Sequence, residues 1–312
     1  MDDLFARLHR ALPELTLLQN EPLARHTSFQ IGGPCAVMAL PESEAQIKAL
    51  MALLRGSKIT PLIIGRGTDL LVTDAPLDRV AVKLGEGFSR VRSLDTAATD
   101  AAPAGGGRLY AEAGCALKKF AEAAAELGLA GLEFAHGIPG SVGGACVMNA
   151  GAYGGEMKDV VTRVRILDAA GDILDLDAAD CDFSYRHSVF SDSDAVILGC
   201  EVALDRDDPA AIFERMRELY ARRSAKQPLD LPSAGSTFKR PQTGYAAALI
   251  EEAGLKGFRI GNAAVSEKHA GFVVNLGGAA FADVRAVMAY VQRAVYEHSG
   301  VKLEPEVRII KN

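Results

Sequence analysis

The chain has 312 residues, of which 49% are hydrophobic and 24% charged, so its composition excludes an intrinsically disordered protein and suffices for two or three packed units. The 34 Lys and Arg residues against 40 Asp and Glu residues give a net charge of −6. A nucleic-acid-binding surface therefore has no support from the overall charge. The five cysteines form no C-x-x-C pair, which favours reduced thiols over a disulfide framework or a zinc ribbon.

The sequence also contains no segment typical of a membrane or secreted protein. The start, MDDLFARLHRALPEL, carries charges throughout and lacks the continuous apolar core of a signal peptide. The longest stretch without Asp, Glu, Lys or Arg is residues 134–155, but it holds seven glycines and a proline and is a poor membrane span. We expect a soluble, cytoplasmic protein with no membrane span.

Apolar periodicity predicts a mixture of helices and strands along the first half of the chain. Ser43-Glu44-Ala45-Gln46 resembles a capping box, and Ile47, Leu50, Met51 and Leu54 form the apolar stripe of the helix that follows. The other predicted elements here are an amphipathic helix within residues 1–20, strands at 35–40, 61–65, 70–72, 79–84, 88–94 and 108–112, and a helix at 116–127 ended by Gly128.

The second half of the chain continues this mixed pattern. Strands at 161–168 and 172–176 flank Ala170-Gly171, which is typical of a hairpin, and Asp208-Pro209 predicts a helix start. The remaining predicted elements are strands at 196–204, 272–275 and 307–310 and helices at 209–223, 245–253 and 283–299. The pattern predicts an α+β fold with boundaries near residues 60 and 205, hence parts 1–60, 61–205 and 206–312.

A first glycine-rich site is Gly65-Arg66-Gly67-Thr68-Asp69, which follows a predicted strand. Glycines let a ligand approach the backbone closely, and their N–H groups can form an anion-binding nest. The segment lacks the third glycine and the following helix of a dinucleotide-binding fingerprint. On its own the segment is more typical of an ordinary turn than of a binding loop.

A second site is the block GIPGSVGGACVMNAGAYGGE at 137–156, which is too uncharged for an exposed loop. We expect it to be neither strand nor helix, so its backbone polar groups need partners elsewhere. Wrapping around a large, partly polar cofactor would supply them. The alternative is a glycine-rich turn buried against its own protein.

A third site is PSAGSTFKRP at 232–241, in which Ser236 lies between small residues just before Lys239 and Arg240. The G-x-S-x-G elbow of acyl-transfer enzymes is absent, and the local sequence alone favours a simple turn. Arg222, Arg223 and Lys226 form a basic cluster that also fits a solvated helix end. The histidines show no metal-ligand spacing, so we predict no metal site.

Taken together, several segments resemble one family over nearly the whole chain. They are NEPLARHTSF at 20–29, the block 137–156, Tyr185-Arg186, AGSTFKRP at 234–241, VSEKHAGFVVN at 265–275 and LEPEVRII at 303–310. In this order they resemble the UDP-N-acetylenolpyruvoylglucosamine reductase (MurB) family. AGSTFKRP is similar to the shorter, type II branch.

The resemblance implies a flavoenzyme of peptidoglycan precursor synthesis. It implies non-covalent FAD, NADPH as co-substrate, and reduction of UDP-N-acetylglucosamine enolpyruvate to UDP-N-acetylmuramate by hydride transfer from flavin N5. The implied fold is α+β, with a two-part FAD-binding unit of the vanillyl-alcohol-oxidase-like type and a C-terminal α+β substrate-binding domain.

The resemblance also implies roles for three side chains. Ser236 corresponds to the proton donor, and Arg186 and Glu306 to the residues that stabilise the enolate. An always-charged guanidinium suits a carboxylate with developing enolate charge. Glu306 would help only when protonated, and burial would favour that form. A nearby cation, Lys226 or Lys239, should stabilise the alkoxide that Ser236 leaves.

The implied binding residues fall in the glycine-rich segments and around them. Thr68-Asp69 replaces the family's frequent Ser-Asn pair, so we expect Asp69 to accept from a sugar hydroxyl or a backbone N–H. The FAD-binding set is Gly65, Arg66, Gly67, Thr68, Asp69, Gly137, Ile138, Pro139, Gly140, Ser141, Gly143, Gly144, Asn149, Gly151 and Arg223, and the substrate-binding set is Tyr185, Lys226, Lys239 and Arg308.

Two other functions stay open at this point. One is a different FAD oxidoreductase on the same fold, such as an oxidase of alcohols or sugars, in which the flavin is often covalently attached. The other is a flavin- or nucleotide-binding module without catalysis. A yellow pellet after acid precipitation would favour the oxidase, because it indicates covalent flavin. Loss of substrate reduction in a Ser236→Ala variant that still binds FAD would favour the reductase over the module.

Overall fold

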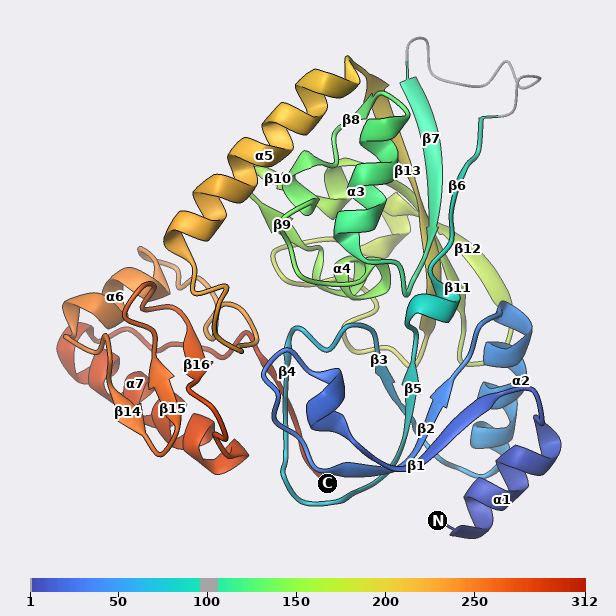
Figure 1. Ribbon diagram of the computed structural model, residues 1–312, viewed down its shortest axis with the longest axis horizontal. Helices are drawn as coiled ribbons and strands as arrows, with labels where there is room; N and C mark the ends of the chain where they lie inside the picture. Colours follow the sequence, from blue (N-terminus) through green and yellow to red (C-terminus); the bar gives the residue numbers. More distant parts are fainter. Residues whose placement is uncertain (1, 96–105) are drawn as a thin grey trace. The chain divides into compact units, whose positions relative to one another are not determined.

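The computed structural model describes residues 2–95 and 106–312 (Figure 1). Its contacts divide the chain into two compact units, each assembled from segments that are distant in sequence. Unit 1 comprises Met1–Leu18, Val37–Arg66 and Arg79–Arg222, and unit 2 comprises Gln19–Ala36, Gly67–Asp78 and Arg223–Asn312. The sequence predicted boundaries near residues 60 and 205 between the FAD-binding parts and the substrate-binding domain. These functional boundaries stay a prediction.

One layer of unit 1 is a four-stranded sheet with two helices. The strand order is β1 (Thr16–Pro22), β2 (Pro34–Leu40), β5 (Leu77–Lys83), β3 (Leu62–Ile64), and the helices are α1 (Asp2–Ala11) and α2 (Glu44–Gly56). The predicted stripe of α2 is fully or nearly fully buried. Ser43 Oγ accepts from Gln46 N at 3.2 Å, as predicted. Gln46 Oε1 instead accepts from Glu42 N, so only half of the capping box forms.

The second layer of unit 1 is an antiparallel sheet around the long strand β13 (Val196–Arg206), with α3 (Leu117–Glu126) and α4 (Val142–Met148) packed against it (Figure 1). The strand order is β12 (Ile173–Asp177), β11 (Val161–Leu167), β13, β7 (Gly106–Glu112), β6 (Val91–Ser93), and β8 (Leu129–Ala130) also pairs with β13. A small hairpin, β9 (Gly151–Ala152) and β10 (Gly155–Glu156), follows α4, and α5 (Pro209–Lys226) begins in this unit.

Unit 2 is built around α7 (Phe281–Ser299), whose buried face of valines packs on the antiparallel sheet β14 (Arg259–Ile260), β15 (Ala263–Val265), β16 (Val273–Asn275). Helix α6 (Ala246–Glu252) joins this core. A separate parallel pair joins β17 (Arg308–Ile310) to β4 (Leu70–Val72), with Arg308 opposite Leu70. Although 238 positions separate Arg308 from Leu70, this pairing places the final strand beside the segment that follows Gly67.

The block at 137–156 differs from its prediction, because it contains α4. Ser141 caps the helix by accepting from Gly144 N, and Asn149 ends it in the left-handed conformation at φ 41°. Glycine disfavours helix in isolation, but a Cβ on Gly143 would lie 2.9 Å from the Ala113 Cβ. Close packing on β7 and its following loop therefore outweighs the local propensity.

The helices of the described residues include none that is both long and apolar enough to cross a membrane.

Candidate active site

In unit 1, the two glycine-rich segments approach each other at Gly65 and Ser141. Gly65 follows β3, and a Cβ there would lie 2.1 Å from Ser141 Oγ. The carbonyl of Gly140 accepts from Leu117 N at 3.0 Å, which fixes the second segment on α3. Arg66 extends into solvent with its Nη1 3.3 Å from Glu86 Oε1. Six of the residues predicted to bind the cofactor in the second segment are half-buried or exposed: Gly137, Ile138, Pro139, Gly140, Gly144 and Gly151.

In unit 2, Gly67 is held by the segment that contains the motif at 20–29. It has φ +63°, and a Cβ there would lie 2.0 Å from the carbonyl oxygen of His26. The Gly67 carbonyl accepts from Ser28 N at 3.0 Å, and Ser28 Oγ donates to the Ser233 carbonyl at 2.6 Å. Ser28 thus ties the Gly67 loop to the segment that leads to Ser236. Ser28 belongs to the motif NEPLARHTSF at 20–29, but the sequence predicted no role for it.

The predicted proton donor and the predicted glutamate come together in unit 2. Residues 237–239 pair with residues 304–306: Lys239 N donates to the Glu304 carbonyl at 2.8 Å, and Glu306 N donates to the Thr237 carbonyl at 2.9 Å. Thr237 Oγ1 accepts from Val273 N and anchors this pair on β16. Ser236, the residue before Thr237, is half-buried, and its hydroxyl forms no hydrogen bond within the described parts of the chain.

The other predicted residues of unit 2 differ in exposure, and two of them are adjacent to each other. The Asp69 carbonyl accepts from Arg308 N at 2.9 Å, so the first glycine loop and the final strand are adjacent. Arg223 is buried, whereas Lys226, in the last turn of α5, is exposed. Thr68 and Lys239 are half-buried.

The Arg186 side chain belongs to a tight turn in unit 1. Ser184 N donates to the His187 carbonyl at 3.0 Å, and His187 N donates to the Ser184 carbonyl at 3.2 Å. Arg186 lies in the left-handed region with φ 55°, and its guanidinium is 5.0 Å from the centre of the Tyr185 ring. Tyr185 is half exposed. A non-glycine residue at positive φ is uncommon and is often found at functional sites.

One titratable group in unit 2 lies close to the Ser236 segment. Burial lowers the pKa of His269 below its ordinary value of 6.5. His269 Nδ1 accepts from Gly271 N at 3.1 Å, which requires that nitrogen to be unprotonated. Gly271 in turn accepts from Thr237 N at 2.8 Å. The neutral imidazole thus supports the backbone beside Ser236.

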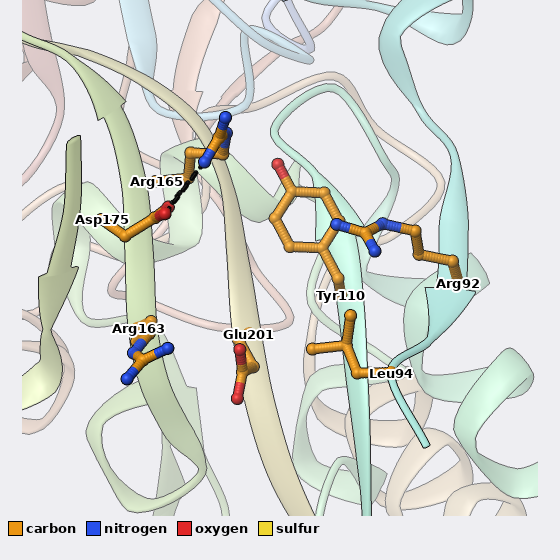
Figure 2. A pocket seen from close by; sticks show the side chains of 7 residues that line it. All are labelled: Arg92, Leu94, Tyr110, Arg163, Arg165, Asp175 and Glu201. Atoms are coloured by element: carbon orange, nitrogen blue, oxygen red, sulfur yellow. Dashed lines mark hydrogen bonds and ion pairs between the residues drawn. The ribbon is translucent and has the colours of Figure 1, made fainter. Parts of the chain in front are cut away.

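A small cavity of about 100 Å³ lies on the charged face of the β13 sheet and includes none of the predicted residues. In Figure 2 the Arg165 guanidinium lies beside the Asp175 carboxylate, and Arg92 lies near the Tyr110 ring. Arg165 also pairs with Glu44 on α2, and Arg163 pairs with Asp177. Arg163 and Arg165 are thus paired with carboxylates of the neighbouring strand β12, as is common for cross-strand neighbours on the solvent face of an antiparallel sheet.

Within residues 2–95 and 106–312, no three His, Cys, Asp or Glu side chains gather as metal ligands. The glycines of these loops serve close packing within each unit: an added Cβ would meet Ser141 at Gly65 and Ala113 at Gly143 in unit 1, and His26 at Gly67 in unit 2. The half-buried or exposed backbone of residues 137–140 and of Gly144 is the part of the second loop that a diphosphate-containing cofactor could contact.

Comparison with known proteins agrees with this geometry. A family model described as FAD binding domain matches residues 34–177, and one described as UDP-N-acetylenolpyruvoylglucosamine reductase, C-terminal domain, matches residues 227–310. A UDP-N-acetylenolpyruvoylglucosamine reductase of Caldanaerobacter subterraneus subsp. tengcongensis is 47% identical over 97% of both chains. One from Agathobacter rectalis is 45% identical over 96% of this chain and 95% of its own.

A solved structure extends the similarity to three dimensions. The crystal structure of UDP-N-acetylenolpyruvylglucosamine reductase (MurB) from Thermus caldophilus has a TM-score of 0.77 and 29% identity, covering 95% of this chain and 99% of that one. The predicted α+β fold, with an FAD-binding part and a distinct C-terminal domain, is therefore confirmed.

Proposed function

This chain belongs to the UDP-N-acetylenolpyruvoylglucosamine reductase family of FAD-dependent oxidoreductases, and from that premise we propose that it uses NADPH to reduce UDP-N-acetylglucosamine enolpyruvate to UDP-N-acetylmuramate. The observation that carries the proposal is the pairing of residues 237–239 with 304–306, which brings Ser236 beside Glu306 across 70 positions of sequence. We further propose that the reaction belongs to peptidoglycan precursor synthesis in the cytoplasm.

The glycine-rich loops would hold the cofactor. Gly65 and Gly140 in unit 1, and Thr68 in unit 2, are half-buried and carry backbone N–H or hydroxyl groups of the kind that bind a diphosphate. When bound, FAD supplies the transfer of hydride from NADPH to the enolpyruvyl group. The chain's own side chains must then bind the substrate carboxylate, stabilise developing charge and deliver a proton.

Arg186 would bind the substrate carboxylate. Its guanidinium stays protonated at every physiological pH and can form two parallel hydrogen bonds to a carboxylate. Hydride addition to the enol ether's β-carbon leaves negative charge on the α-carbon and the carboxylate. Arg186 would bind that charge more strongly than the ground state, which is the requirement for catalysis.

Ser236 would donate the proton to the α-carbon. Its hydroxyl has no competing hydrogen bond within the described chain. A serine hydroxyl is a weak acid, so Lys226 or Lys239 would stabilise the alkoxide that remains. Glu306, held beside Thr237, would contribute in its protonated form, because a second anion would repel the substrate carboxylate.

A Ser236→Ala variant tests this assignment against Ser299→Ala, a matched change at an exposed helix end. The protein, loaded with FAD, is mixed anaerobically with NADPH and then with the enolpyruvyl sugar nucleotide while the flavin absorption is followed. We expect both variants to bleach with NADPH at the wild-type rate. Recovery of the absorption on adding the sugar nucleotide should slow by about 10²–10⁴-fold in Ser236→Ala only.

Each other result contradicts a specific part of the proposal. Recovery at the wild-type rate in Ser236→Ala would remove Ser236 as proton donor. A wild-type protein that bleaches with NADPH but ignores the sugar nucleotide would indicate a different FAD oxidoreductase. A wild-type protein that binds FAD and never bleaches would indicate a flavin-binding module without this activity.

A further inference from the structure

The turn that carries Arg186 adopts a conformation that its own residues disfavour. Arg186 carries a β-carbon and lies at φ 55°, and the residue before it, Tyr185, is half exposed, with its ring 5.0 Å from the Arg186 guanidinium. The two hydrogen bonds between Ser184 and His187 close the turn but do not fix its direction. Such a backbone conformation persists when surrounding groups determine it.

Asn149 supplies the first of these surrounding contacts. Its side chain is fully buried at the C-terminal end of α4. One Nδ2 hydrogen bond goes to the Ser184 carbonyl at 3.1 Å and another to Glu156 Oε2 at 2.6 Å. Oδ1 accepts from Lys158 N at 2.9 Å. Asn149 therefore joins α4, the β9–β10 hairpin and the Arg186 turn at a single point.

Ser188 supplies a second contact on the other side of the turn. It is fully buried, and its Oγ donates to the Val147 carbonyl at 2.8 Å. Val147 lies in the last turn of α4, where carbonyls lack a partner within the helix. Both ends of the Arg186 turn are thus attached to the same short helix, whose other end packs against Gly65 through Ser141.

We propose that Asn149, together with Ser188, is a positioning residue that fixes the Ser184–His187 turn and thereby the Arg186 guanidinium. The inference rests on the proposed role of Arg186 in binding the substrate carboxylate. It replaces the expectation that Asn149 contacts FAD, because both N–H groups of its amide are already donated to protein acceptors and none of its surface is exposed.

The residue type follows from the geometry. The position requires a left-handed backbone, which asparagine tolerates better than most residues. It also requires two N–H donors and one acceptor on a short side chain. Aspartate has no N–H and would place a second carboxylate against Glu156. Glycine keeps the backbone conformation and removes only the side chain, which makes Asn149→Gly the informative variant.

The test compares Asn149→Gly with Lys58→Gly, which makes the same change at another left-handed residue, exposed and remote from the site. In the FAD-loaded enzyme, we expect Asn149→Gly to leave flavin reduction by NADPH and FAD affinity unchanged. We expect reoxidation by the enolpyruvyl substrate to slow by about 10²-fold, because a misplacement of about 1 Å can cost this much. Lys58→Gly should match wild type in all three measurements.

A double variant separates positioning from other roles. If Asn149 acts through Arg186, then Asn149→Gly should cost nothing further in an Arg186→Ala background. An independent readout is hydrogen exchange of the His187 amide, which donates to Ser184. We expect this exchange to accelerate about tenfold or more in Asn149→Gly and to stay unchanged in Lys58→Gly. If Asn149→Gly fails to fold, Ser188→Ala tests the same turn by both measurements.

The outcomes distinguish this inference from the proposed function. Unchanged His187 exchange, additive losses in the double variant, or weakened FAD binding with normal reoxidation would overturn the positioning role. Full activity of Arg186→Ala would instead overturn the proposed role of Arg186. In that case faster His187 exchange in Asn149→Gly would still support Asn149 as the residue that fixes the turn.

Discussion

Gly67→Ala is the substitution whose cost the structure defines most directly. Gly67 lies at φ +63°, and an added Cβ would be 2.0 Å from the His26 carbonyl oxygen. The left-handed conformation costs a non-glycine residue about 1–2 kcal/mol. A comfortable carbon–oxygen separation is about 3.3–3.6 Å, so the backbone must shift by about 1.3 Å or more. Such overpacking adds about 1–3 kcal/mol.

We therefore expect Gly67→Ala to lower the free energy of unfolding by about 2–5 kcal/mol. Gly56→Ala is the matched control, because Gly56 ends α2 with no atom within 4 Å of an added Cβ and no positive φ. There alanine should raise the free energy of unfolding slightly, by up to about 1 kcal/mol, because it is the better helix former.

Urea denaturation at fixed protein and FAD concentration measures both variants, since bound cofactor stabilises the folded state. A shift in the midpoint without a change in slope gives the difference in stability. If Gly67→Ala unfolds at the wild-type midpoint, the contact with His26 does not constrain this loop and the reasoning is wrong. FAD affinity, followed by flavin fluorescence, should fall in Gly67→Ala and stay unchanged in Gly56→Ala.

Two further predictions concern polar side chains of unit 2, the buried Asn275 and the half-buried His269. Asn275→Ala should lower stability by about 2–4 kcal/mol in urea denaturation, because it leaves the buried Phe29 carbonyl without its 2.9 Å donor and the N–H groups of Gly277 and Ala279 without an acceptor. A loss below about 0.5 kcal/mol would contradict this. The lowered pKa of His269 means that the unfolded chain binds the proton more readily than the folded one, so stability should be complete above pH 6.5 and fall as the pH drops below it. His269→Gln should flatten this decline between pH 7.5 and 5.5, and an unchanged slope would assign it to other groups.

Local sequence was sufficient to predict most of the helices and strands. Helix α2 starts at its capping serine and buries its predicted stripe because both properties depend on residues three or four positions apart. The hairpin β11–β12 follows from alternation around Gly171, whose φ is +97°. The family resemblance added the roles of Arg186, Ser236 and Glu306, which remain proposals.

Only the tertiary structure decided contacts whose energy comes from distant partners. Two pairings could not be predicted from the sequence: residues 237–239 with 304–306, and β17 with β4. Both consist of backbone hydrogen bonds, which do not depend on a particular side chain at either partner. Helix α4 formed within a glycine-rich block since packing on Ala113 outweighed propensity. The side chain of Asn149, predicted to contact the cofactor, lies buried among protein acceptors. A sequence shows that an amide is present, but only packing determines which groups its hydrogens reach.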